Sequence, residues 1–290
     1  MHDAEHIQTQ FPKISVVIPT LGGDCLRSTI EQLNRGTVVP VEILVCIPEE
    51  EAYRVAHLPF PNVRVVKTHC RGQVAQRATG FQQAQQSMVM QLDDDIFLEE
   101  GSLRILADTL CLLGQGNALA PVYYEVATGH CIHELADGIQ GFLRSLYYYV
   151  ICGSPWGVKR MGAVTAVGLS FGVDSSHCDE NPFETQWLPG GCVLCFKDDL
   201  ILEKFFPYSG KAYGEDLIHS FLRTKSGTRH WVIPGAKCSI DAPEPELSPL
   251  SISAQVKARR YFVRLSGGSV WRLALYESFS ALKRALSGKG

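Results

Sequence analysis

Short apolar runs alternate with amphipathic stretches over roughly the first 120 residues of the chain. Apolar side chains such as Leu26, Ile30 and Leu33 recur at helical spacing, and similar spacing predicts helices over residues 71–86 and 102–113. The apolar runs, which predict strands, are residues 14–18, 41–47, 63–66, 87–92 and 118–122. Strands that are apolar along their whole length are typical of a parallel sheet covered on both faces. The pattern therefore predicts an α/β fold with a central, mostly parallel, Rossmann-like sheet flanked by helices.

The second half of the chain has a less regular pattern. Residues 123–186 mix aromatic side chains with many glycines and predict no definite element. Further along, we expect a strand over residues 187–196, helices near 197–205 and over 216–223, and a strand over 230–233. This half is therefore expected to combine sheet and helices with long loops.

The C-terminal end differs from the rest of the chain in charge. Residues 251–290 contain eight basic side chains and one acid, Glu277, whereas residues 1–250 carry a net charge of −10. The same end has an apolar stripe at helical spacing, made of Trp271, Leu275, Phe279, Leu282 and Leu286. Two structures fit this pattern: a helix lying in the surface of an anionic membrane, or a terminal helix docked on its own domain with a solvated basic face.

Composition excludes several classes of protein. The chain has 290 residues, of which 46% are hydrophobic, and its net charge is −3, so we expect a folded and not a disordered protein. No apolar stretch reaches the roughly 20 residues that a membrane-spanning helix needs. The ten cysteines are spread along the chain and the N-terminus has no apolar signal segment, which favours the cytoplasm. The closest pair, Cys192 and Cys195, lies on a predicted strand and should point to opposite faces.

Two groups of acids are candidates for chemistry. Asp93, Asp94 and Asp95 directly follow a predicted strand, where open α/β sheets bind ligands, and such mutually repelling carboxylates suit a divalent cation such as Mg²⁺ or Mn²⁺. Glu215 and Asp216 stand at the predicted start of a helix. Taken alone, the acids 93–95 are also explained as an acidic loop tip. Glu215 and Asp216, taken alone, are also explained as a helix cap. The chain has neither a phosphate-binding loop nor a dinucleotide fingerprint.

Taken in order, the motifs resemble those of glycosyltransferase family 2. They are Pro19-Thr20, Arg71-Gly72-Gln73 with Arg77 and Gly80, Leu92-Asp93-Asp94-Asp95, Trp187-Leu188-Pro189-Gly190-Gly191 and Gly214-Glu215-Asp216. The resemblance covers about residues 13–240 and implies an inverting, nucleotide-sugar-dependent enzyme of the GT-A fold. It implies a GT-A domain over residues 1–250, followed by a basic amphipathic helical segment over 251–290. The motif of processive synthases is matched only loosely, so the resemblance implies a single transfer of a hexosyl or deoxyhexosyl group.

The resemblance also implies roles for individual residues. Pro19, Thr20, Glu49, Arg77, Asp93 and Asp94 are expected to bind the nucleotide sugar, and Asp93 and Asp95, the ends of the DxD motif, to hold Mn²⁺ or Mg²⁺. Trp187, Gly190 and Gly191 would lie on the sugar and acceptor side. Asp216 would be the general base, with Glu215 beside it contacting the acceptor. Family members often have Asn after the helix arginine and a late metal-binding histidine; this chain has Ala78, and Asp241 is the only strong ligand in the stretch 237–241.

Two other functions remain open from the sequence. A nucleotidyltransferase would share the acidic metal site but should show a basic, glycine-rich loop after the first strand, where this chain has Gly22 and Gly23 with only Arg27 nearby. A catalytically silent binding protein would be expected to lack Asp95 or Asp216, and both are present. The expected partners are a nucleotide-sugar donor and a glycan or lipid-linked acceptor, without nucleic acid. The basic C-terminus adds a peripheral contact with the inner face of the membrane.

Overall fold

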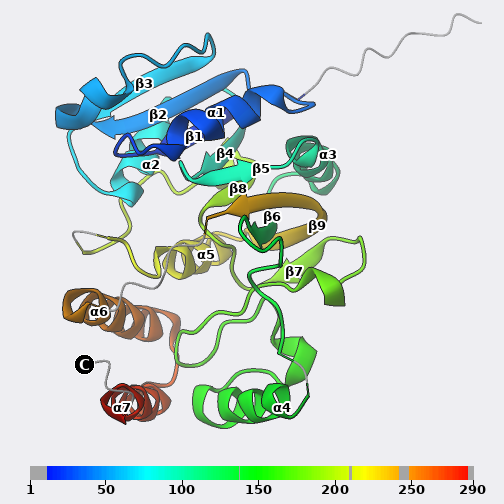
Figure 1. Cartoon of the computed structure of the whole chain (residues 1–290), viewed down its shortest axis with the longest axis vertical. Coiled ribbons are helices and arrows are strands. Elements are labelled where there is room, and N and C mark those ends of the chain that lie inside the picture. The colour runs from blue at the N-terminus through cyan, green and yellow to red at the C-terminus, as the bar shows by residue number, and fades with distance from the viewer. Residues whose placement is uncertain (1–11, 137, 209–210, 242–247, 287–290) are drawn as a thin grey trace, which may run out of the picture.

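A nine-stranded mixed sheet forms the centre of the molecule (Figure 1). The computed structural model describes residues 12–136, 138–208, 211–241 and 248–286. The strands are β1 (Ile14–Pro19), β2 (Glu42–Pro48), β3 (Val63–Thr68), β4 (Met88–Leu92), β5 (Ile96–Leu98), β6 (Asn117–Glu125), β7 (Phe183–Thr185), β8 (Cys192–Phe196) and β9 (Arg229–Ile240). Their order across the sheet is β3-β2-β1-β4-β8-β6-β9-β5, and β7 pairs with β9.

The direction of the strands changes part-way across the sheet. Strands β3, β2, β1 and β4 pair in parallel, as do β6 and β9, whereas β8 runs antiparallel to both β4 and β6. Strands β5 and β7 are antiparallel to β9. The predicted α/β sheet flanked by helices is confirmed, and its parallel part is mainly the N-terminal half. Helical crossovers force parallel pairing there, while the long loops before β7 and β8 allow either direction.

Alternate residues of the strands enter two separate cores. On β1, Val16 and Ile18 pack on one side and Val17 on the other. The helices α1 (Cys25–Arg35) and α3 (Ser102–Leu113) cover the first side, and α2 (Gln73–Gln83) covers the second. This two-sided burial explains why β1, β2 and β4 are apolar at most positions. It also explains Cys192 and Cys195, which are buried in opposite cores, as their spacing predicted.

Three further helices lie at the end of the molecule remote from β3 (Figure 1). They are α4 (Gly138–Tyr147), α6 (Pro249–Ser266) and α7 (Val270–Leu286). Helix α6 begins after Ser248, whose side chain accepts a hydrogen bond from the amide of Ser251, and ends at Gly267 with a φ of 73°. Helix α5 (Glu215–Lys225) lies between this group and the sheet, and packs against α6 through Leu217, Ile218 and Phe262.

Several sequence-based expectations need correction. The helix expected near residues 197–205 is wrong: only Lys197–Asp199 forms a 3-10 turn. Asp199 there accepts hydrogen bonds from the amide of Gly116, so its polar side chain holds a loop instead of continuing a helix. The segment 123–186 contains α4 and β7, which its pattern did not predict. In the described residues, all ten cysteines are unpaired, and no helix is long and apolar enough to cross a bilayer. Residues 287–290 of the expected C-terminal segment lie outside the described part.

Candidate active site

The two acidic groups meet at the carboxyl end of β4. The amide of Asp93 donates to the carbonyl of Gly191 (2.8 Å), which joins the end of β4 to the segment before β8. The side chain of Gln91, buried within β4, donates to the carbonyl of Gly190. Residues 93–95 and the loop 187–191 therefore form one wall, and the start of α5 lies directly against it.

Arg77 connects the acidic triplet to the start of α5. This guanidinium, on α2, forms ion pairs with Asp93 and with Glu215, and Arg77 is only 2% exposed. Burial opposes the ionisation of Arg77, but the two carboxylates outweigh it and raise its pKa above the ordinary value. The segments that carry Asp93 and Glu215 are 122 positions apart in the chain, and one cation holds them together.

The three aspartates of the triplet have different partners. Asp93 turns inward, and its Oδ1 also accepts a hydrogen bond from Gln73 (2.9 Å). Asp94 accepts one from the hydroxyl of Thr20 on the loop after β1. Burial, followed by the neighbouring carboxylates of Asp93 and Asp94 and then that of Asp241, raises the pKa of Asp95 to about 6. Asp95 thus faces Asp241, an acid outside the triplet, and has no basic partner among the described interactions.

The loop after β1 is held from two sides. Gln76 of α2 donates to the carbonyls of Thr20 and Cys46, each at 2.7 Å, so the ends of β1 and β2 are fixed to the same helix. Pro19 pairs with Cys46 in the sheet. Glu49 follows β2 at this edge but is exposed, with its carboxylate 3.8 Å from His69. Pro19 and Thr20 are therefore brought to the acidic triplet, while Glu49 has no described contact with it.

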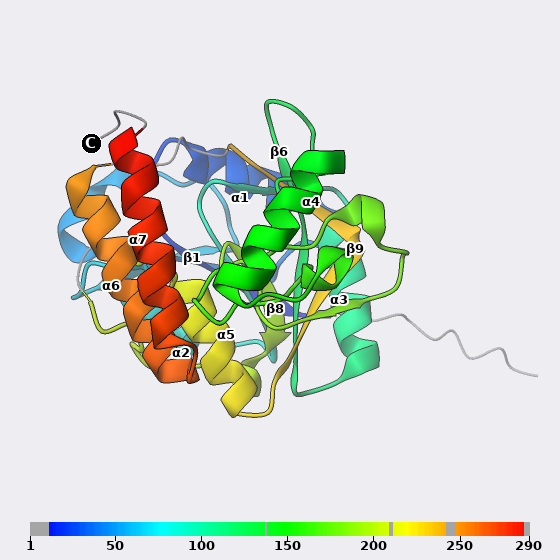
Figure 2. The ribbon, with the colours of Figure 1, turned by 90° about the horizontal axis from the view of Figure 1, so that it is seen from below.

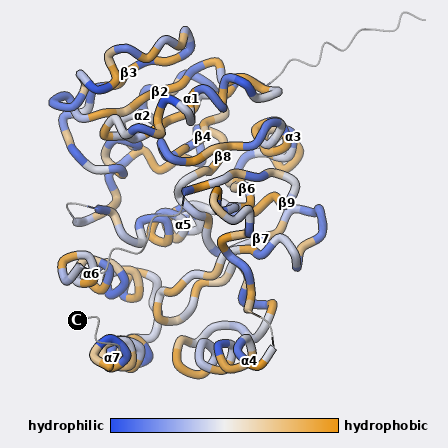
Figure 3. The backbone as a smooth tube through the Cα atoms, viewed as in Figure 1, coloured by the Kyte–Doolittle hydropathy of each residue, from blue (hydrophilic) through white to orange (hydrophobic). Residues whose placement is uncertain are grey.

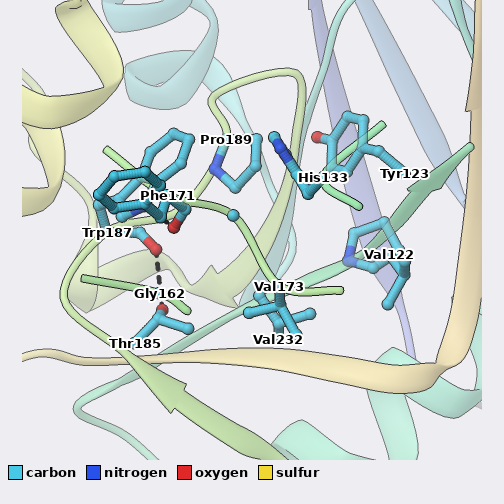
Figure 4. A pocket seen from close by; sticks show the side chains of 12 residues that line it. Val122, Tyr123, His133, Gly162, Phe171, Val173, Thr185, Trp187, Pro189 and Val232 are labelled. Atoms are coloured by element: carbon cyan, nitrogen blue, oxygen red, sulfur yellow. Dashed lines mark hydrogen bonds between the residues drawn. The ribbon is translucent and has the colours of Figure 1, made fainter. Parts of the chain in front are cut away.

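A glycine permits the loop 187–191 to approach α5 closely. A Cβ atom on Gly190 would lie 3.0 Å from Oε1 of Glu215 and 3.4 Å from Cβ of Asp216. Trp187 is buried and donates from Nε1 to the carbonyl of Phe171 (2.8 Å), so its ring serves packing in this structure. Behind it lies a cavity of ≈ 10 Å³ (Figure 4), with room for about one water molecule. That cavity is too small for a sugar.

Asp216 lines an open pocket. It is half-buried, and burial together with the adjacent Glu215 carboxylate raises its pKa to about 7. The pocket of ≈ 320 Å³ beside it is formed by the loop 168–170, the start of α5 and one face of α6, including Gln255 and Arg259. Glu215 has the opposite environment, because it is buried against Arg77 and does not line this pocket. A carboxyl group that titrates near neutrality at the edge of a pocket is suited to accept a proton.

The sequence matches no protein-family model and no curated protein. Among solved structures, the chain is similar to a crystal structure of GalNAc-T7 with UDP, GalNAc and Mn²⁺, with a TM-score of 0.61 and 15% identity. The chain has the GT-A fold. The match covers 87% of this chain and 48% of that one, so the chain spans about half the length of the solved protein. At 15% identity, the likeness extends to the GT-A fold alone.

The donor atoms at this edge of the GT-A sheet suit a hard cation. Asp95 and Asp241 contribute carboxylates, and Asp94 lies next to them; such oxygen ligands are those that Mg²⁺ and Mn²⁺ prefer. Their mutual repulsion, seen in the raised pKa of Asp95, is what a bound cation would relieve. However, within the described residues no group of three or more His, Cys, Asp or Glu side chains is already arranged to hold a metal ion.

Sequence reasoning assigned no role to the glutamines of the site, although Gln73 stands in one of the motifs. Gln73, Gln76 and Gln91 hold Asp93, the loop after β1 and Gly190, respectively. The signal for Gln91 was present, since it is the one polar residue of the otherwise apolar strand β4. A polar side chain buried in such a strand needs a hydrogen-bond partner, which points to an adjacent polar site. Gln73 and Gln76 gave no comparable signal, because polar residues are common near the start of a helix.

Proposed function

We propose that the chain is an inverting, non-processive, metal-dependent glycosyltransferase similar to family 2. It would move a hexosyl or deoxyhexosyl group from a nucleotide sugar to an acceptor hydroxyl. The observation that carries the proposal is the Arg77 bridge, which joins the acidic triplet to the helix that bears Asp216. The GT-A fold shared with a protein solved with UDP and Mn²⁺ supports a nucleotide sugar as donor.

Donor binding is assigned to the edge formed by β1 and β4. Thr20 and Asp94 are linked by a hydrogen bond and would face the ribose, with Pro19 beside the base and Glu49 farther out on the rim. Asp93 shares its Oδ1 between Arg77 and Gln73, which leaves Oδ2 for the nucleotide. Arg77 and Glu215, both buried, are positioning residues in this scheme: they hold the donor half against the start of α5.

Asp95 and Asp241 are the residues that we propose would hold the divalent cation, with Asp93 as the further ligand that the motif suggests. When bound, the cation supplies Lewis-acid stabilisation of the negative charge on the departing diphosphate. The assignment of Asp241 follows from its place next to Asp95, and it fills the position at which the resemblance expects a histidine.

Transfer itself is assigned to Asp216. Its carboxylate accepts the proton of the acceptor hydroxyl as that oxygen forms a bond to C1 of the sugar. The bond from C1 to the diphosphate oxygen breaks in the same step, and its electron pair leaves with the nucleoside diphosphate. Because the base lies on the pocket side and the leaving group on the triplet side, a single displacement inverts C1. The protonated Asp216 then returns its proton to solvent through the open pocket.

The proposal is tested by thermal unfolding with a panel of nucleoside diphosphates and nucleotide sugars, each with and without Mn²⁺. A true donor should raise the melting temperature, because a ligand at about 100 times its Kd stabilises by about 2.7 kcal/mol. Asp95→Asn should remove the Mn²⁺-dependent part of the shift. Asp198→Asn, an exposed acid on the 3-10 turn after β8, is the matched control and should keep it.

Three outcomes would contradict the proposal. If no nucleotide stabilises the chain with either cation, the site does not bind a sugar donor. If the chain releases pyrophosphate from a nucleoside triphosphate and a sugar phosphate, it is a nucleotidyltransferase. If a nucleotide sugar binds but is neither transferred nor hydrolysed in the presence of a broad acceptor extract, the chain is a binding protein with the GT-A fold.

A further inference from the structure

Helices α4 and α7 lie side by side (Figures 1 and 2), and both expose apolar side chains. We call the surface that these side chains form the lower face. On α4, the exposed apolar residues lie within an arc of about 100° at 3.6 residues per turn. On α7, those after Val270, the first residue of the helix, lie within about 80°. They are Ile139, Phe142, Leu143 and Leu146 on α4, and Trp271, Leu275, Phe279, Leu282 and Leu286 on α7. Figure 3 shows apolar segments on both helices.

The lower face is a fixed surface and not a pair of loose helices. Buried residues Cys152, Val167, Val263 and Leu273 form a small core that joins the segment after α4 to α6 and α7. Arg272 of α7 donates to the carbonyl of Val150 in the π-helix η2 (Tyr148–Cys152), which continues α4. The two apolar arcs are thus held in a constant relation to each other.

The stripe of α7 points away from the protein. Glu277 pairs with Arg260 of α6, and Glu277 lies about 160° around the helix from the centre of the stripe. Helix α6 therefore covers the opposite side of α7. Of the two structures that the sequence left open for this helix, the structure shows the second, with α7 docked on its own domain, but the apolar stripe remains uncovered. Trp271 is 62% exposed and Phe142 on α4 is 57% exposed.

An aromatic cluster marks the α4 side of the lower face. Trp156 contacts Phe142 and Tyr149 edge to face, with ring centroids 5.6 and 5.8 Å apart, and all three are exposed. Tryptophan and tyrosine favour the boundary between lipid headgroups and acyl chains, because they join an apolar ring to a polar group. Leucine and phenylalanine beside them suit the adjoining acyl region.

The charge on the same segments is complementary to an anionic surface. Residues 138–160 contain three basic residues and no acid, and residues 270–286 contain three basic residues and one acid, the paired Glu277. Arg144, Lys159 and Lys283 are exposed. The rest of the chain is acidic overall, so these cations mark one end of the molecule.

We infer that the lower face docks the protein on the surface of a bilayer that contains anionic lipids, with α4 and α7 lying in the plane of the membrane. The sequence suggested such a contact through the basic C-terminal helix alone. The structure adds α4 and the Trp156 cluster as the second part of the contact surface. Apolar side chains enter the headgroup boundary, and the flanking cations hold lipid phosphates. This inference does not depend on the proposed transferase activity.

The test is vesicle co-sedimentation of the full chain with phosphatidylcholine vesicles, with and without phosphatidylglycerol. The chain should bind the anionic vesicles and lose binding at high salt. Phe142→Glu and Trp271→Glu should each weaken binding at least about tenfold, and Lys159→Gln and Lys283→Gln about fivefold each. Leu112→Glu on α3 is the matched control: Leu112 is 87% exposed but distant from α4 and α7, so binding should be unchanged.

Tryptophan fluorescence provides a second measurement that does not depend on loss of binding. Brominated lipids should quench Trp156 and Trp271, and a double Trp156→Phe, Trp271→Phe variant should bind but lose that quenching. Equal binding to neutral and anionic vesicles would overturn the role of charge. Absence of vesicle binding, with a dimer by light scattering that Phe142→Glu dissociates, would show that a second copy covers the lower face and would overturn the inference.

Discussion

Arg77 neutralises two carboxylates that come from opposite halves of the chain. Neither Asp93 nor Glu215 has another basic partner in the described interactions, and the Arg77 guanidinium is buried. Removing one member of such a buried network leaves the others charged and poorly solvated. The resulting loss of stability is larger than the net stability that the intact network contributes. The site therefore depends on Arg77 for its folding as well as for its geometry.

Replacement of Arg77 should destabilise the protein strongly. We expect Arg77→Met to lower the free energy of unfolding by about 3–5 kcal/mol. Arg77→Lys should also be destabilising, because a single ammonium cannot reproduce the fork that reaches both carboxylates. Urea denaturation measures the change. Arg27→Met, which breaks an exposed pair with Glu31 on α1, is the control and should cost no more than about 1 kcal/mol. Equal losses for the two variants would refute the buried bridge.

Asp216 should control the rate of transfer and its dependence on pH. Asp216→Asn is expected to lower the transfer rate by about 10²–10⁴-fold while donor binding stays nearly unchanged. In the proposed mechanism Asp216 accepts a proton only when ionised, so kcat/KM of the wild type should rise with pH and level off above a pKa of about 7. A pH–rate profile measures both effects. A collapse of donor affinity in the variant would instead make Asp216 a structural residue.

The raised pKa of Asp216 also predicts an effect on stability. Because the folded pKa of about 7 lies above the unfolded value, this group favours folding only while protonated, and its contribution is lost as pH rises through 7. Asp216→Asn should therefore be more stable than the wild type at pH 8, by about 1–4 kcal/mol. Below about pH 4 the difference should vanish. Thermal unfolding at the two pH values checks this, and a variant less stable at pH 8 would contradict it.

The residue types in the sequence predicted where the site lies better than they predicted the role of each side chain in it. The acids 93–95 and 215–216 were identified because their charges needed an explanation, and the structure brings them together. Which carboxylate turns toward Arg77 and which toward the pocket depends on side-chain orientation, which no spacing encodes. Glu215 was expected at the acceptor and is instead buried against Arg77, so that expected contact has no support in this structure.

At the scale of elements, α2 is the helix most tightly fitted to the sheet. Its Gly80 lies against β1 and β2, where an added Cβ would collide with a methyl group of Val17 and lie 2.6 Å from Sγ of Cys46. Glycine is normally a poor residue inside a helix, about 1 kcal/mol worse than alanine. Its presence here lets α2 approach closely enough for Arg77 and Gln76, one turn earlier, to reach the site.

Gly80→Ala should therefore destabilise the protein despite the better helix propensity of alanine. We expect a loss of about 1–3 kcal/mol in the free energy of unfolding, from overpacking against β1 and β2. The Val17→Ala background offers a control, because it removes one of the two colliding groups and should reduce the penalty of Gly80→Ala. A stabilising Gly80→Ala would mean that α2 can shift outward without cost.

Elements with a strong pattern were predicted well, and those fixed by distant contacts were not. The helix over 102–113 coincides with α3, because its periodic apolar residues face one core. The segment 197–205 forms only a 3-10 turn followed by a loop, and Asp199 in it is hydrogen-bonded to the distant Gly116. The short strand β7 pairs with the edge that β9 offers. The apolar residues Ile139, Phe142, Leu143 and Leu146 of α4 face outward, against the usual helical rule.

On the scale of the whole molecule, the C-terminal helices are part of the folded core. Ala258, Phe262 and Val263 of α6 are buried against α5 and the segment after α4. The proposed boundary near residue 250 is therefore a change in charge and pattern between two parts that pack together. We still treat residues 251–290 as a segment with its own function. Truncation tests whether this segment folds separately.

Truncation after residue 248 should lower the melting temperature substantially. Removal of α6 would expose apolar surface of Leu217, Ile218 and Trp187 and open the wall of the Asp216 pocket. We expect a drop of at least about 10 °C or aggregation, measured by differential scanning calorimetry. Truncation after residue 286, which spares α7, is the control and should be neutral. An unchanged melting temperature for the shorter chain would show that residues 249–290 are an independent unit.

The pocket beside Asp216 draws its walls from a different part of the chain than the edge at Thr20 and Asp94. Gln255, Arg259 and the loop 168–170 belong to the second half, and the described lining of this pocket includes neither Thr20 nor Asp94. Under the proposed function, selection could thus change the acceptor by altering α6 and this loop while the choice of donor is inherited unchanged. Chimaeras that exchange only these two segments between homologues would reveal such a division of specificity.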